Sequence, residues 1–160
     1  MGGARGAGGP ELELRLLGPL EVSRRGRPVA LGGPKPRALL AVLALELGRV
    51  VSLDRLVEDL WPRTPPETAA HAVQVYVSQL RKALGDVLAR QGPGYTLALE
   101  RSRVDLHRFT QLTGDGREQR QAGDAASAAG TLRDALALWR GPALADFAYE
   151  PFAQADIARL

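Results

Sequence analysis

The sequence predicts an α+β domain over residues 11–100, followed by the start of an all-α domain over residues 104–160. Three observations support this. Short runs that alternate apolar and polar residues open and close the first part, as half-buried strands do. Amphipathic helical patterns lie between those runs, and beyond Arg101 the chain changes to alanine-rich helical patterns.

The composition restricts the class of protein. Hydrophobic residues make up 45% of the chain and charged residues 24%, which is ordinary for a globular protein with a packed core. There is no cysteine, so disulfides and thiolate metal sites are excluded and a cytoplasmic location is expected. No apolar run is long enough to span a membrane, and residues 1–10, half of them glycine, are expected to form a disordered tail.

The first strands should form a small antiparallel meander. Leu12–Leu17 alternates leucine with charged residues up to the turn at Gly18-Pro19. Leu20–Ser23 repeats the alternation, and Pro28–Leu31 follows a turn at Arg25-Gly26.

Three helices should follow the meander. The first is expected over Pro36–Leu47, and the second from Leu53 to Trp61 with Ser52 as its N-cap. The third is expected over Ala69–Leu84, with Thr68 as its N-cap. Its apolar stripe has the spacing of one buried helix face and comprises Val73, Val77, Leu80 and Leu84.

A hairpin should close the first domain. Two strands are predicted, over Val87–Arg90 and Tyr95–Leu99, and they are joined by the turn Gln91-Gly92-Pro93-Gly94. Strands, three helices and a terminal hairpin together make a winged helix-turn-helix. The aromatic residues Tyr95, Trp61 and, further along, Trp139 continue apolar stripes, so we expect them in the core.

The second part reads as helical repeats. Asp105 is expected to cap a helix that contains Leu106, Phe109 and Leu112. A second helix over Ala125–Trp139 has an apolar stripe made of Ala128, Leu132, Ala135, Leu136 and Trp139, and Pro151 should open a third that reaches Leu160. Such units need stacked neighbours to bury their faces, so the chain is expected to be truncated in mid-domain.

An enzymatic site is not expected. The only two histidines, His71 and His107, lie on different predicted helices, and no cluster has metal-ligand spacing. There is no Gly-x-Ser-x-Gly elbow, and Gly33-Pro34-Lys35-Pro36 lacks the Gly-Lys-Ser/Thr of a phosphate loop. We therefore expect no catalytic residue, no metal and no cofactor.

The outward face of the third helix is the candidate functional surface. At 100° per residue, the side opposite the apolar stripe holds His71, Val75, Ser78 and Lys82, and the flanks hold Gln74, Gln79 and Arg81. Gln can bond adenine, Arg or Lys can bond guanine, and Val can contact a thymine methyl group. The alternative is an ordinary solvated helix face. The net charge is +3, and all of the basic excess lies in residues 1–100.

The order of elements distinguishes these interpretations, because the set resembles the winged-helix effector domain of OmpR-type response regulators. Val73–Leu84 looks like that family's recognition helix, and Gly92–Tyr95 resembles the tip of its wing. Ser52–Leu56 and Leu60-Trp61 resemble its second helix. No receiver domain and no acidic phosphoacceptor cluster are visible, although the family belongs to phosphorelay signal transduction.

The second part resembles the bacterial transcriptional activation domain of the Streptomyces antibiotic regulatory protein family. The similarity rests on Val104–Phe109, Leu132–Leu144 and Glu150–Phe152. It implies a tetratricopeptide-like helical domain and an activator of a biosynthetic gene cluster. It also implies partners: double-stranded DNA with promoter direct repeats, RNA polymerase and its sigma factor, and a second protomer that forms a dimer on DNA.

The resemblance also implies which residues contact DNA. Gln79 occupies a base-reading position, and Tyr76 and Lys82 contact the backbone. Arg90 and Gln91 belong to the wing, which reaches the minor groove. The other DNA-facing positions are His71, Ala72, Val75, Ser78 and Arg81. Related sequences often have Arg where this chain has Gln79 and Gln91, so its base preference should differ.

A different class of function stays open from the sequence. The alternative is a protein-interaction scaffold formed by the helical repeats, with a winged domain that binds protein and not DNA, because fold alone does not determine function.

Overall fold

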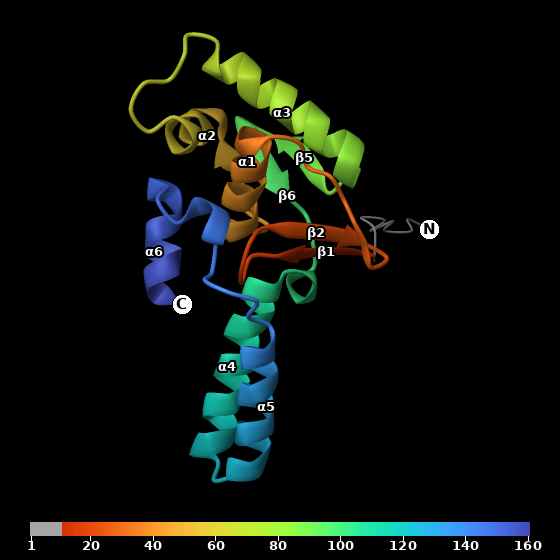
Figure 1. Ribbon diagram of the computed structural model, residues 1–160, viewed down its shortest axis with the longest axis vertical. Coiled ribbons are helices and arrows are strands. Elements are labelled where there is room, and N and C mark those ends of the chain that lie inside the picture. The colour runs from red at the N-terminus through yellow and green to blue at the C-terminus, as the bar shows by residue number, and fades with distance from the viewer. Residues whose placement is uncertain (1–10) are drawn as a thin grey trace. The chain divides into compact units, whose positions relative to one another are not determined.

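The computed structural model describes residues 11–160, so the tail expected over residues 1–10 lies outside the described residues. The chain divides into two compact units. Among the described residues, the first unit comprises Glu11 and Leu12 together with Val22–Leu99, and the second comprises Glu13–Glu21 together with Glu100–Leu160. Figure 1 shows the elements of both.

Three helices form the centre of the first unit: α1 (Pro34–Leu45), α2 (Leu53–Leu60) and α3 (Ala69–Leu84). Each of them packs against the other two. Strands β4 (Val51–Ser52), β6 (Gly94–Leu97) and β5 (Leu88–Gln91) form an antiparallel sheet in that order. This sheet contacts all three helices, so the expected terminal hairpin is confirmed and is joined by a short third strand.

A second antiparallel pair in this unit is formed by β2 (Glu21–Arg24) and β3 (Arg27–Pro28). Arg24 lies opposite Arg27 in the register, and Arg25 and Gly26 make the two-residue turn. Both turn residues have positive φ, 52° and 75°, as a tight hairpin of this length requires.

The core of the first unit confirms the predicted orientation of α3. Its four stripe residues, Val73, Val77, Leu80 and Leu84, are at most 3% exposed. Leucines of α1 and α2 meet them, and Tyr95 and Leu97 of β6 are also buried. The period of the sequence therefore determined which face of α3 points outward.

Helix ends differ in detail from the prediction. α1 runs over Pro34–Leu45, two residues earlier at each end than expected, because proline is well tolerated in the first helical turn. Ser52 caps α2 as expected, accepting a hydrogen bond from the Arg55 amide at 3.1 Å. Thr68 stands at the N-cap of α3, but its side chain makes no capping bond, since its backbone (φ −89°, ψ 12°) is not extended.

The second unit contains α4 (Asp105–Gln121), α5 (Ala125–Ala137) and α6 (Pro151–Arg159), with 3-10 turns at Arg101–Arg103 and Ala145–Phe147. α4 and α5 lie side by side as a helical hairpin (Figure 1). Gly116 allows their close approach, because a Cβ atom there would lie 2.8 Å from the Leu132 side chain. Phe109 and Trp139 meet edge to face, with ring centroids 5.3 Å apart.

Three expectations about these helices are wrong. Asp105 is not an N-cap: Val104 takes that position, and Asp105 is the first residue of α4. Leu136 is 66% exposed, because it lies about 100° around α5 from the buried Ala135. α5 itself ends at Ala137, before Trp139.

The Asp105 carboxylate instead binds the segment Glu13–Glu21 of its own unit. Its two oxygens accept hydrogen bonds from the amides of Leu16 at 2.7 Å and Leu17 at 3.0 Å. Burial raises the pKa of the Asp105 carboxyl, and the amide donors act in the opposite direction. Within the same unit, Leu14 of β1 (Leu12–Arg15) pairs with Val104 in parallel.

Arg140 makes a second attachment to the same segment. Its Nη2 donates to the Pro19 carbonyl at 2.7 Å, and its Nη1 lies 2.9 Å from the Glu21 carboxylate. The sequence pattern placed residues 13–21 with the winged domain, whereas the structure places them in the compact unit of the helices.

Every helix within residues 11–160 is too short or too polar to cross a bilayer.

Candidate nucleic-acid interface

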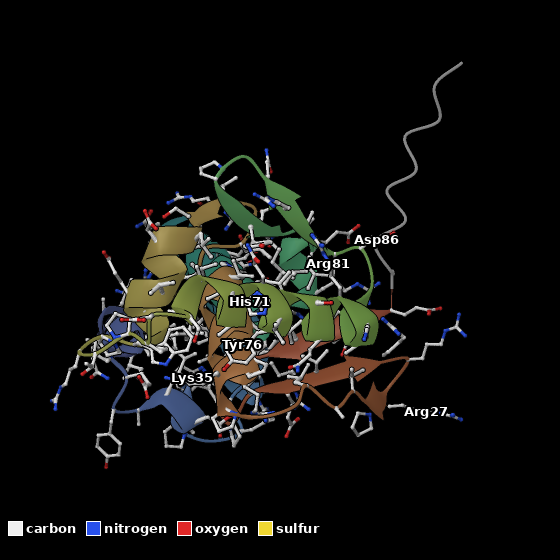
Figure 2. The ribbon with its side chains drawn as sticks, turned by 90° about the horizontal axis from the view of Figure 1, so that it is seen from above. Arg27, Lys35, His71, Tyr76, Arg81 and Asp86 are labelled. Carbon is white, nitrogen blue, oxygen red and sulfur yellow. The ribbon has the colours of Figure 1, made fainter. Side chains whose placement is uncertain are left out.

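The outer face of α3 carries most of the residues that the sequence predicts to contact DNA. Opposite the buried stripe, its side chains are exposed (Figure 2). Val75, at 39% exposure, is the apolar member of this face. The exposed predicted residues of α3 are His71, Val75, Ser78, Gln79, Arg81 and Lys82.

Two of the predicted residues of α3 are less exposed to solvent. Ala72 is half-buried, and Tyr76 is half-buried against an aromatic neighbour. The Tyr76 ring stacks on Trp61, the C-cap of α2, with 6.4 Å between centroids and 28° between planes. The Lys35 ammonium of α1 lies 5.1 Å from the centroid of the Trp61 ring and donates to the Leu60 carbonyl. We call Lys35, Trp61 and Tyr76 the aromatic–lysine stack.

The C-terminal end of α3 is anchored by two arginines. Arg81 donates through Nε to the Leu88 carbonyl of β5 at 2.9 Å, which ties the helix to the hairpin. Arg24 of β2 donates through Nη2 to the Leu84 carbonyl at 3.0 Å. A cation at this end of a helix is favourable, because the last carbonyls lack intrahelical partners.

The hairpin holds the remaining two predicted residues at its tip. Arg90 pairs with Tyr95 and Gln91 with Gly94 across the strands, and the side chains of Arg90 and Gln91 are exposed. The tip is also fixed to α2, since the Leu53 amide donates to the Pro93 carbonyl at 3.1 Å.

Gly94 is required by the close contact between strands β6 and β4. A Cβ atom at this position would lie 1.9 Å from the Val51 carbonyl oxygen, so no larger residue fits without displacing β4. The glycine that appears in the sequence as a turn signal is therefore a packing requirement of the wing.

The structure thus brings the predicted residues onto two anchored elements of one unit, eight on α3 and two on the hairpin. Sequence reasoning missed Lys35 and Arg24, because their partners are distant in the chain and no local pattern identifies them. Within residues 11–160, no group of His, Cys, Asp and Glu side chains could hold a metal ion. The site can offer hydrogen bonds, positive charge and a small apolar contact.

Comparison with known proteins assigns both units. Residues 26–97 match the family described as transcriptional regulatory protein, C terminal. Residues 104–160 match the family described as bacterial transcriptional activator domain.

Individual relatives match over most of this chain, across both parts. The transcriptional regulatory protein EmbR of Mycobacterium tuberculosis is 41% identical over 155 residues, which cover 90% of this chain and 40% of EmbR. The regulatory protein AfsR of Streptomyces coelicolor is 40% identical over 151 residues, which cover 93% of this chain and 15% of AfsR.

A solved structure of Mycobacterium tuberculosis EmbR, in complex with a low-affinity phosphopeptide, matches with a TM-score of 0.89 and 38% identity. The match covers 93% of this chain and 41% of that one, so this chain spans less than half the length of these relatives. The fold class predicted from the sequence, a winged helix followed by the start of a helical domain, is confirmed.

These families and relatives are transcriptional regulators and not enzymes, in agreement with the expectation from the sequence. Taken together, the two family matches and the similarity to AfsR confirm the predicted resemblance to the Streptomyces antibiotic regulatory protein family of transcriptional regulators.

Proposed function

We propose that this chain is a sequence-specific, DNA-binding transcriptional activator of a biosynthetic gene cluster. The observation that supports this best is the division of α3 into a fully buried stripe and an exposed polar face. A helix held in this way can enter the major groove, which is wide enough to admit it.

In this proposal, each predicted side chain has a role on the duplex. Gln79, Ser78, Val75 and His71 face base edges in the major groove, with Ala72 and Arg81 beside them. Tyr76 and Lys82 contact phosphates, which fix the orientation of the helix. Arg90 and Gln91, at the tip of the hairpin, reach the adjacent minor groove.

We propose residues 11–100 as the DNA-binding domain and residues 104–160 as the beginning of the activation domain. The protein would act in the cytoplasm and bind promoter direct repeats as a head-to-tail dimer. Its helical domain would present a surface to RNA polymerase and its sigma factor.

Binding-site selection from random duplexes tests the DNA-binding part. We expect enrichment of one motif, present twice in tandem, and retention that falls steeply with salt concentration because phosphate contacts release counterions. A chain that enriches no motif and binds no duplex at low ionic strength would contradict the proposal and favour the protein-interaction scaffold.

Activation is tested separately, by transcription in vitro from a promoter that carries the selected motif. We expect more transcript with the chain than without it, and no effect when the motif is scrambled. Binding without any change in transcript would limit the function of this chain to DNA binding.

A further inference from the structure

The β2–β3 turn concentrates positive charge in an unfavourable arrangement. Three of its four residues are arginine: Arg24, Arg25 and Arg27 surround Gly26. Arg24 and Arg27 are directly opposite in the register, a placement in which like charges destabilise a strand pair. Arg25 has a left-handed backbone (φ 52°), a conformation that Asn, Asp or Gly adopts more readily.

The described residues neutralise this charge only in part. Arg25 pairs with the Glu11 carboxylate, and Arg24 is bound to the Leu84 carbonyl, which has no formal charge. Across residues 11–160, no ion-pair partner is found for the exposed Arg27. One carboxylate therefore faces three guanidinium groups.

These side chains also border an open groove. It has a volume of about 720 Å³ and is lined by Glu11, Arg24, Arg25, Arg27, Pro28 and Val29. The hydrogen bond from Arg24 to Leu84 places the groove beside the C-terminal end of α3 within the same unit. Figure 2 shows Arg27 extending outward from the turn, on the side of the unit where α3 ends.

We propose that this basic groove binds the sugar–phosphate backbone of DNA, in the stretch that flanks the bases read by α3. The inference rests on the proposed function and adds a second contact to it. A run of phosphates supplies the negative charge that the three arginines lack, and guanidinium groups bind phosphate oxygens in a bidentate manner. The groove recognises no base. It therefore adds affinity and fixes the position of the protein along the duplex, without adding sequence preference.

The test uses the full chain and the motif obtained by selection, in two duplexes. One duplex extends well beyond the motif on both sides, and the other is trimmed to the selected base pairs. The variants are Arg25→Asn, which removes the charge and suits the left-handed backbone, and Arg27→Gln. The control is Arg117→Gln, which removes one exposed charge from α4 of the second unit.

Each groove variant should weaken binding to the long duplex by about 3- to 10-fold at low salt. The slope of log affinity against log salt should become shallower by about one for each lost contact. The preferred motif should stay the same, and on the trimmed duplex the variants should equal the wild type. Arg25→Asn should melt no lower than the wild type, which separates the loss of binding from unfolding.

The contrary outcomes are distinct. A wild-type chain that binds no duplex would overturn the proposed function, and this inference with it. A wild type that binds, with groove variants that match it on the long duplex or lose no more than Arg117→Gln does, would overturn this inference alone. Variants that bind one motif normally but lose cooperativity on two tandem motifs would instead assign the groove to an acidic surface of a second copy.

Discussion

The Tyr76 ring stacks on the Trp61 ring, with 6.4 Å between centroids, while the Lys35 ammonium lies 5.1 Å from the Trp61 centroid. The three side chains come from α1, the end of α2 and α3, so this aromatic–lysine stack ties the three helices together at one point. Tyr76 is half-buried and lies beside the exposed residues of α3 in the sequence.

Trp61→Leu should lower the free energy of unfolding by about 1–2 kcal/mol, because both the aromatic pair and the cation–π contact are lost. Thermal or urea denaturation measures this. The matched variant Tyr76→Phe keeps the stack and removes only the hydroxyl, so it should fold normally and bind all duplexes somewhat more weakly. Equal stability of Trp61→Leu and the wild type would show that the stack contributes nothing to the fold.

Gln79→Ala should cost about 1–3 kcal/mol of binding to the selected motif and relax the preference at one base pair, because a glutamine amide can bond a base edge at two points. Selection repeated with the variant measures the preference. Gln121→Ala, at the exposed end of α4, is the control and should change neither quantity. An unaltered motif and affinity for Gln79→Ala would mean that the assigned face of α3 does not read DNA.

Lys82→Ala should weaken binding to every duplex alike and make the salt slope shallower by about one, because it removes one phosphate contact. Lys82→Arg preserves the charge and should keep the wild-type slope. Titrations at several salt concentrations on specific and unrelated duplexes measure both effects. If Lys82→Ala loses affinity only for the selected motif, Lys82 reads a base.

Gly94→Ala should destabilise the first unit by about 1–3 kcal/mol, because a Cβ atom 1.9 Å from the Val51 carbonyl oxygen forces β6 and β4 apart. Denaturation curves measure the loss. Gly33→Ala is the control: its φ is −77° and a Cβ atom there meets nothing within 4 Å, so stability should change little. Similar curves for the two variants would contradict the close packing of β6 on β4.

Asp105→Asn should destabilise the second unit by about 1–3 kcal/mol. The amide that replaces one carboxylate oxygen cannot accept a bond, so either the Leu16 or the Leu17 N–H loses its acceptor in a buried site. Asp115→Asn, an exposed position on α4, removes the same charge and should leave stability unchanged. If the two variants unfold alike, the attachment of residues 13–21 through Asp105 is not stabilising.

Periodicity accounts for what could be predicted about the first unit. The spacing of Val73, Val77, Leu80 and Leu84 allows only one face of a helix to be apolar, so the burial of those residues follows from the local sequence. The hairpin could also be predicted from the sequence, because strand alternation and the Gly92-Pro93-Gly94 turn are local signals.

The second unit shows where local signals mislead. Asp105 precedes an apolar helical pattern and so resembles an N-cap, yet its carboxylate binds amides about 90 residues away in the chain. Leu136 falls within the apolar pattern of α5 but is exposed, because the small side chains Ala128 and Ala135 are the ones buried on that helix. Neither outcome is encoded in the neighbouring residues.

By itself, the sequence determined the class of the fold, the outward face of α3 and the residues along it, because hydrophobic period depends only on neighbours a few positions apart. The tertiary structure alone decided what anchors that helix and what surrounds it: Arg24 at the Leu84 carbonyl, Trp61 on Tyr76, and the basic groove of the β2–β3 turn. These contacts join residues that are far apart in the chain. These contacts depend on how the elements pack, and the hydrophobic period of a single segment carries no information about that packing.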